Sequence, residues 1–103
     1  MAVHKITKEN FDSMVKQNEK TVLLDFYADW CGPCRMVSPV VDEIAEERGD
    51  ILVGKINVDD DPSLAQEFGI ISIPTLIVMK NGKAESKAVG VRPKDAILAM
   101  LDA

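Results

Sequence analysis

The chain has 103 residues, carries a formal net charge of −5, and is 47% hydrophobic and 28% charged. This length holds one domain, and this balance of residues is typical of a globular protein rather than a disordered or membrane-spanning one. The negative charge argues against nucleic acid as a partner, because phosphate binding needs clustered Lys and Arg. We therefore expect a single domain over residues 1–103 that acts as a monomer.

The N-terminal part of the chain predicts a strand followed by a helix. Residues 3–6 form a short strand candidate. Thr7 is the expected N-cap of the helix, whose apolar face would carry Phe11, Met14 and Val15. This helix should begin directly after the first strand.

The middle of the chain predicts two strands on either side of a long helix. Residues 21–28 are a nearly unbroken apolar run, typical of a strand covered on both faces, and residues 51–58 predict another buried strand. Between them, Val37, Val41 and Ile44 recur at helical spacing, with charged residues on the opposite face. Such strands belong in the middle of a sheet.

Two further helices are predicted in the C-terminal half. Asp61 and Pro62 supply an N-cap and a first-turn proline for a short helix that ends at Gly69. Pro93 opens the final helix, whose apolar residues again recur at helical spacing.

A hairpin separates these two helices. Residues 75–80 and 84–91 flank Asn81 and Gly82, which both tolerate the positive φ of a tight turn, so the two strands should be antiparallel neighbours. The full element order is then βαβαβαββα. This order predicts an α/β fold with a mixed central sheet and helices on both faces.

Cys31 and Cys34 follow a central strand and lie at the start of a helix, where their side chains can close a disulfide. The free N–H groups and the dipole of the helix favour a thiolate at Cys31 and lower its pKa. Cys34 lies one turn into the helix, where we expect it to be better shielded. Cys31 would therefore attack a client disulfide, and Cys34 would then attack Cys31 and release the reduced client.

A static disulfide and a metal site are the structural alternatives for these cysteines. A disulfide that closes so short a loop stabilises a fold little, and the lone His4 cannot complete a metal site with two cysteines. We therefore expect redox chemistry with no metal and no bound cofactor.

The sequence resembles the thioredoxin family over essentially its whole length. The resemblance rests on the run from Asp25 to Cys34, which contains Trp30-Cys31-Gly32-Pro33-Cys34, and on Pro39, Lys55, Ile73-Pro74-Thr75, Gly82 and Gly90. It implies a thioredoxin fold and the activity of a thiol-disulfide oxidoreductase that reduces protein disulfides.

The resemblance also implies a docking surface for clients. The Ile73–Pro74 peptide bond would be cis and face the dithiol, so that the backbone of Ile73 pairs with an extended client segment. The surface would be apolar and exposed, and it would comprise Trp30, Gly32, Pro33, Ile73, Pro74, Val89 and Gly90.

Asp25 is a further candidate, because a carboxylate within an apolar strand is costly to bury as an anion and its pKa should rise. The resemblance implies that it exchanges protons with Cys34, with Lys55 on the next strand as its charge partner. The alternative is a buried structural pair without a role in proton transfer.

The chain lacks the glycine fingerprint of a nucleotide site, so its electrons should come from another protein, which the resemblance implies is a thioredoxin reductase. Two alternatives remain, namely a thioredoxin-fold binding or chaperone-like module and a disulfide isomerase. The start of the chain lacks the features of a signal peptide, and no apolar stretch has the length of a membrane helix. We expect a cytoplasmic location, although a removed targeting segment would leave no trace.

Overall fold

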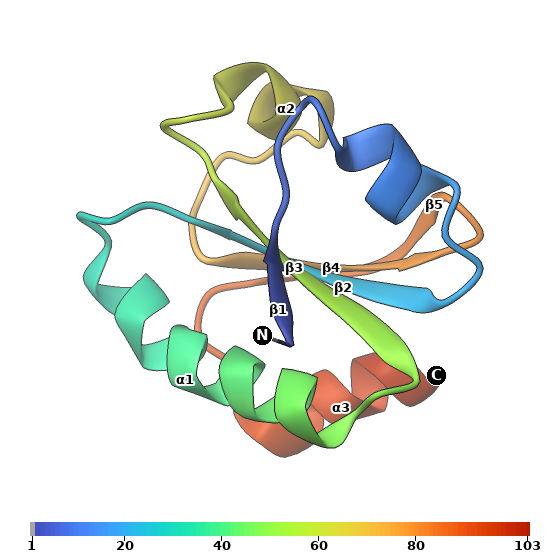
Figure 1. Ribbon diagram of the computed structural model, residues 1–103. Coiled ribbons are helices and arrows are strands. Elements are labelled where there is room, and N and C mark those ends of the chain that lie inside the picture. Colours follow the sequence, from blue (N-terminus) through green and yellow to red (C-terminus); the bar gives the residue numbers. More distant parts are fainter. Residues whose placement is uncertain (1) are drawn as a thin grey trace.

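The structure is a computed structural model that describes residues 2–103, and a five-stranded sheet forms its centre (Figure 1). The strands lie in the order β1-β3-β2-β4-β5. β1, β3 and β2 are parallel to one another, whereas β4 is antiparallel to β2 and β5 to β4. The elements are β1 (Val3–Lys5), η1 (Asp12–Lys16), β2 (Thr21–Tyr27), α1 (Gly32–Glu47), β3 (Ile51–Asn57), α2 (Pro62–Glu67), β4 (Thr75–Lys80), β5 (Lys83–Val89) and α3 (Lys94–Asp102).

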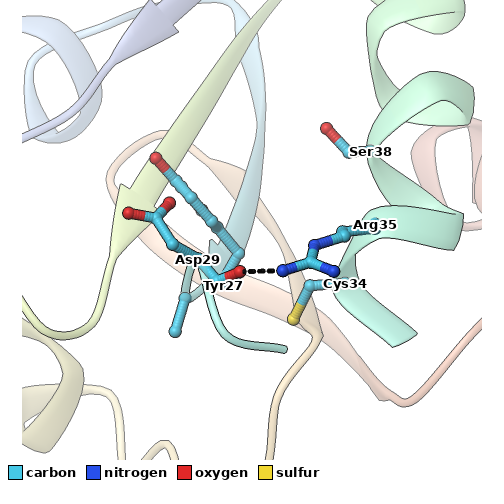
Figure 2. A pocket seen from close by; sticks show the side chains of 6 residues that line it. Tyr27, Asp29, Cys34, Arg35 and Ser38 are labelled. Atoms are coloured by element: carbon cyan, nitrogen blue, oxygen red, sulfur yellow. Dashed lines mark hydrogen bonds between the residues drawn. The ribbon is translucent and has the colours of Figure 1, made fainter. Parts of the chain in front are cut away.

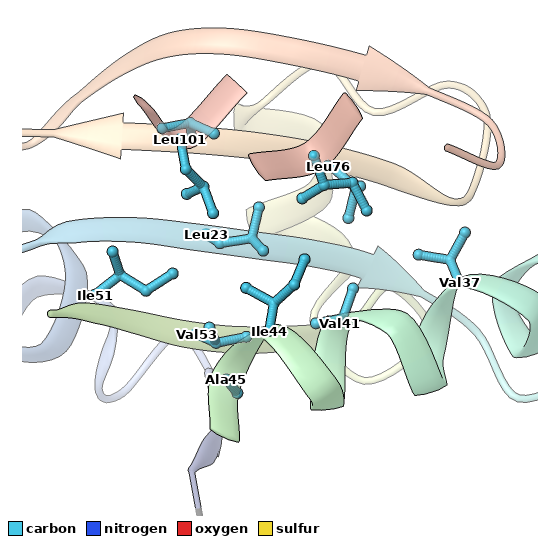
Figure 3. Close-up of a cluster of buried hydrophobic side chains, with 11 residues drawn as sticks. Leu23, Val37, Val41, Ile44, Ala45, Ile51, Val53, Leu76 and Leu101 are labelled. Carbon is cyan, nitrogen blue, oxygen red and sulfur yellow. The ribbon is translucent and has the colours of Figure 1, made fainter. Parts of the chain in front are cut away.

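Helices cover both faces of this sheet, as predicted. α1 and α3 lie against one face, and η1 and α2 lie on the other (Figure 1). Successive residues of a strand point to opposite faces, so Leu23 of β2 packs under α1 and α3 while Leu24 packs under η1 and α2. Figure 3 shows the first of these two cores, in which Leu23 meets Val41 and Ile44 of α1. Since both neighbours of β2 are strands and both of its faces are covered, its apolar run is explained.

The first helix differs from the prediction. Thr7 does not cap a helix, because its backbone N–H donates to the side-chain oxygen of Asn10 at 2.8 Å. The Asn10 amide in turn donates to the carbonyl of Lys5 at 2.9 Å, which fixes a turn over residues 7–10. Helical structure begins only at Asp12, as the short π-helix η1. A local side-chain hydrogen bond therefore replaces the expected helix start.

The ends of the other helices are close to the prediction. Asp61 occupies the N-cap position of α2, but its carboxylate accepts the N–H of Lys8 at 3.1 Å instead of capping the helix. Gly69 follows the end of α2 with a φ of +66°. Pro93 lies at the N-cap of α3, one residue earlier than a first-turn proline.

The hairpin is confirmed, with φ values of +53° at Asn81 and +76° at Gly82. β5 ends at Val89, two residues before the predicted end of this strand. Gly82 also lies against η1, because a Cβ atom there would be 2.7 Å from the carbonyl oxygen of Lys16. Within residues 2–103, no helix has both the length and the apolar character needed to cross a membrane.

Candidate active site

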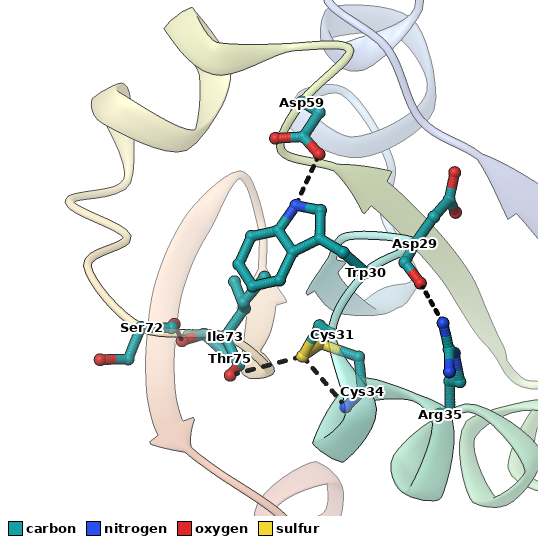
Figure 4. Close-up of a disulfide and its surroundings, with 9 residues drawn as sticks. All are labelled: Asp29, Trp30, Cys31, Cys34, Arg35, Asp59, Ser72, Ile73 and Thr75. Carbon is teal, nitrogen blue, oxygen red and sulfur yellow. Dashed lines mark hydrogen bonds between the residues drawn. A yellow bond between two sulfur atoms is a disulfide. The ribbon is translucent and has the colours of Figure 1, made fainter.

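Cys31 and Cys34 lie at the junction of β2 and α1, and they form a disulfide with a Cα–Cα distance of 5.3 Å (Figure 4). Cys31 is the N-cap residue of α1, with extended backbone, and Gly32 is the first helical residue. Pro33 occupies the first turn, where a missing N–H costs no hydrogen bond. The local sequence thus places the first sulfur at the exact boundary of the helix.

The two sulfurs have different surroundings, although they are equally buried. The backbone N–H of Cys34 donates to Sγ of Cys31 at 3.2 Å, the usual geometry of an N-cap side chain. Sγ of Cys31 also lies 3.8 Å from the carbonyl oxygen of Ile73 (Figure 4). The exposed fractions of Cys31 and Cys34 are 4% and 3%, so the expected difference in shielding is absent in this oxidised form. The asymmetry comes from the hydrogen bond to Cys31.

The loop before β4 lies against the disulfide. The Ile73–Pro74 peptide bond is cis, as the resemblance implied. The hydroxyl of Thr75 donates to the carbonyl of Ser72 at 2.6 Å, and the N–H of Gly90 donates to the carbonyl of Pro74 at 2.8 Å. These bonds join the loop to the end of β5 and so bring Gly90 to the proline.

Most of the predicted docking residues are accessible. The side chain of Trp30 is 68% exposed and Val89 is 45% exposed, whereas Pro74 is buried. The indole N–H of Trp30 donates to the carboxylate of Asp59 at 2.9 Å (Figure 4). Gly32 and Pro33 are exposed, and Ile73 and Gly90 are half-buried. The structure therefore offers an apolar surface beside Cys31.

Asp25 is buried on the face of β2 that α1 covers, and it is 1% exposed. Neither carboxylate oxygen has a hydrogen-bond partner among residues 2–103. Burial raises the pKa of Asp25 to about 6, while the positive charge of Lys55 lowers it and the negative charge of Asp42 raises it. The pKa of the carboxyl group is thus raised towards neutral pH, as predicted from its position in an apolar strand.

The positive charge of Lys55 lowers the pKa of Asp25, which agrees with its expected role as the charge partner, although the two side chains form no direct ion pair. The two residues are register neighbours on β3 and β2, but the ammonium of Lys55 pairs with the carboxylate of Asp42 at 2.7 Å. It also donates to the hydroxyl of Ser38 at 2.5 Å. Both partners belong to α1, which offers the ammonium a carboxylate at the surface instead of the buried one.

A small cavity lies beside Cys34 (Figure 2). Its volume of about 200 Å³ is enough for several water molecules. The guanidinium of Arg35 donates to the carbonyl of Asp29 at 2.8 Å along its wall, and Tyr27 and Ser38 also line it. The cavity therefore offers room for water beside Cys34.

The part of the chain from residue 2 onward contains no cluster of three or more His, Cys, Asp or Glu side chains that could hold a metal ion. The chemistry available at this place is that of the two sulfurs and the buried carboxyl group.

Three residues of this region were missed in the sequence. Ser38 and Asp42 are four residues apart on one helix, so their side chains share a face, and that spacing was the available signal. Asp59 follows β3 as Trp30 follows β2, and the carboxyl ends of adjacent parallel strands meet at one end of the sheet. Their pairing was readable only once the strand order was known.

Comparison with known proteins agrees with this geometry. The thioredoxin family model matches residues 2–103. The chain is similar to a thioredoxin of Pyropia yezoensis, with 50% identity over 99% of this chain and 96% of the relative. It is 41% identical to a thioredoxin of Chlamydia caviae over 94% of this chain and 93% of the relative. It is also 46% identical to the chloroplastic thioredoxin M5 of Oryza sativa subsp. japonica, over 92% of this chain and 56% of the relative.

Thioredoxins act as protein-disulfide oxidoreductases, and the Cys31–Cys34 pair is suited to dithiol-disulfide exchange. The mixed five-stranded sheet, with its helices on both faces, is consistent with the thioredoxin fold. From its fold, its cysteine pair and its relatives alike, the chain belongs to the thioredoxin family.

Proposed function

We propose that this protein reduces protein disulfides, with Cys31 as the attacking sulfur and Cys34 as the resolving sulfur. The observation that carries the assignment is the N-cap position of Cys31, whose Sγ accepts the N–H of Cys34. In the reduced protein, the same N–H and the helix dipole stabilise a negative charge on Cys31. Within residues 2–103, Sγ of Cys34 accepts no such hydrogen bond, so Cys34 remains a thiol until the second exchange.

The reaction then follows in two exchanges. The Cys31 thiolate attacks one sulfur of the client disulfide, a bond forms between them, and the other client sulfur leaves as a thiolate. Cys34 then loses its proton and attacks Sγ of Cys31, which forms the Cys31–Cys34 disulfide and releases the second client sulfur. Two electrons have passed to the client, and the product is the oxidised form seen in the structure.

Asp25 is the proposed acceptor for the proton of Cys34, acting through an intervening water molecule. Its pKa of about 6 lets the carboxyl group both take up and release a proton near neutral pH. Lys55 contributes its positive charge from a distance, since its ion pair is with Asp42.

The client is proposed to dock on the apolar surface beside Cys31. An extended segment would pair with the backbone of Ile73, whose carbonyl already lies 3.8 Å from the attacking sulfur. The surface consists of Trp30, Gly32, Pro33, Ile73, Pro74, Val89 and Gly90. A Cβ placed on Gly32 would meet nothing within 4 Å among residues 2–103, apart from its chain neighbours and the backbone of its own helix, so this position is open to a partner.

The setting of the reaction is also part of the proposal. Residues 1–103 would form a single thioredoxin domain that works as a monomer in the cytoplasm on disulfide-containing client proteins. A thioredoxin reductase would return two electrons to the Cys31–Cys34 disulfide, and no bound cofactor, nucleic acid or membrane would take part. The family membership supports clients and a reductase of this kind.

The assignment of the two sulfurs is tested with Cys34→Ser and Cys31→Ser, assayed for reduction of insulin with dithiothreitol as the electron source. Cys34→Ser should lose turnover, and, once reduced and separated from dithiothreitol, it should accumulate a mixed disulfide with insulin that is visible on a non-reducing gel. Cys31→Ser is the matched control and should neither turn over nor trap insulin. Full turnover in Cys34→Ser would contradict the role of Cys34 as the resolving sulfur, and equal trapping by both variants would contradict the unequal roles.

A further inference from the structure

Two side chains of helix α1 bind the ammonium of Lys55, whereas Asp25 forms neither a hydrogen bond nor an ion pair with it. The Lys55 ammonium lies 2.7 Å from Asp42 and 2.5 Å from Ser38. We propose that Asp42 and Ser38 are positioning residues, which anchor the Lys55 ammonium to α1 and so leave Asp25 without an ion-pair partner in the core. This inference rests on the proposed function, because it concerns the proton acceptor assigned there.

The geometry offers Lys55 two possible ion-pair partners, a buried carboxylate and an exposed one. Asp25 and Lys55 are register neighbours on the parallel strands β2 and β3, and their side chains point to the same face of the sheet. Ser38 and Asp42 are one helical turn apart on α1, which covers that face. The long, flexible side chain of Lys55 is thus placed between a buried carboxylate and an exposed one. Asp42, with 55% of its side chain exposed, costs less desolvation as an anion.

The other charged groups near Asp25 and Lys55 do not compete for an ion pair with either residue. On β1, Lys5 is the register neighbour of Lys55, but its ammonium faces Asp60 at 3.7 Å at the surface. On β4, the register neighbour of Asp25 is the apolar Leu76. His4 and Tyr27 line a groove of about 350 Å³ together with Lys5, Asp42 and Lys55. Within residues 2–103, the charges that shift the pKa of Asp25 are those of Lys55, which lowers it, and Asp42, which raises it.

Loss of the Asp42 carboxylate should therefore change the pKa of Asp25 through two effects that have the same direction. It removes a negative charge that raises the pKa of Asp25, and it frees Lys55 to turn towards Asp25. Both changes favour the ionised form of Asp25. Loss of the Ser38 hydroxyl removes one of the two anchors while leaving the charge of Asp42 in place.

The test is an NMR titration of the Asp25 carboxyl carbon in the oxidised protein, which needs no turnover. In Asp42→Asn we expect the titration midpoint to move to lower pH by about one pH unit, and in Ser38→Ala to move the same way by less. Asp42→Glu keeps the anion on α1 and should restore the midpoint towards that of the wild type. These variants alter half-buried or exposed side chains, so the fold should persist.

Glu46→Gln is the matched control, because Glu46 is an exposed carboxylate one turn further along α1 that makes no ion pair within residues 2–103. It should leave the midpoint in place. An unchanged midpoint in Asp42→Asn, or an equal movement in Glu46→Gln, would overturn the positioning role. A moved midpoint supports that role even if insulin reduction fails, so the failure of the proposed function is seen separately.

Discussion

Asp25 brings a carboxyl group into the core without giving it a polar partner, and its effect on stability has a definite sign. Its pKa is raised by burial from an ordinary value of 3.8 to about 6. The folded chain therefore keeps a proton that the unfolded chain releases between these two pH values. The contribution of Asp25 to stability is most favourable below pH 4, falls as the pH rises to about 6, and then levels off. The difference corresponds to about 3 kcal/mol.

Asp25→Ala should remove this pH dependence. We expect the gain in unfolding free energy over the wild type to be larger at pH 8 than at pH 4 by about 2.5 kcal/mol, because any cost of the cavity is the same at both pH values. Urea denaturation of both proteins at the two pH values measures it. An equal effect at pH 4 and pH 8 would mean that Asp25 ionises in the fold as readily as in the unfolded chain.

At the scale of elements, the β4–β5 hairpin depends on one glycine for two reasons. Gly82 has a φ of +76°, a conformation that residues with a side chain rarely adopt. It also approaches the last turn of η1, where the carbonyl oxygen of Lys16 leaves no room for a Cβ atom. The turn is therefore fixed both by its own backbone and by a contact with a distant segment.

Gly82→Ala should lower the unfolding free energy by about 1–3 kcal/mol, because it adds backbone strain and a steric conflict at once. Gly49→Ala is a suitable comparison, since a Cβ atom there meets nothing within 4 Å. Denaturation midpoints of the two variants should differ clearly. If both alanines were tolerated equally, the approach of the hairpin to η1 would be without consequence.

For the whole molecule, β2 joins the two cores into one cooperative unit. Leu23 and Leu24 are adjacent and fully buried, but they contribute to the opposite faces of the sheet. Neither core can lose its packing on β2 without exposing the other side of the same strand. The fold should thus unfold in one step.

Leu23→Ala and Leu24→Ala should each cost about 2–5 kcal/mol, because each leaves a cavity in a different core. Both variants should keep the denaturant dependence of the wild type, with coincident transitions by far-UV circular dichroism and by fluorescence of Trp30, the only tryptophan. Leu98→Ala, at a half-buried position of α3, should cost less. Transitions that separate in one of the core variants would show that a face unfolds by itself.

The sequence predicted those features that depend on residues close together in the chain. The strands, the Asn81–Gly82 turn and the position of Cys31 at a helix start follow from local patterns, and the structure has them. The turn at Asn10 was missed, since one side-chain hydrogen bond outweighs a helical pattern of apolar residues.

The ion pair of Lys55 with Asp42 was missed for a different reason. The strand register places Lys55 beside Asp25, but its actual partners come from α1, which the tertiary packing brings over the strand. A sequence pattern indicates ion-pair partners from their charge alone. In the folded protein, the choice of partner depends also on the free energy that each carboxylate loses on desolvation.

The outermost strands limit how far the sheet can grow. β1 has only three residues, and β5 carries the exposed charges of Lys83, Glu85 and Lys87. The unpaired backbone of a sheet edge is a template on which other chains add strands, and shortness or charge at the edge blocks such addition. Shortness and charge at the two edges should therefore keep this protein from adding strands of other chains, and it should stay dispersed in crowded solutions.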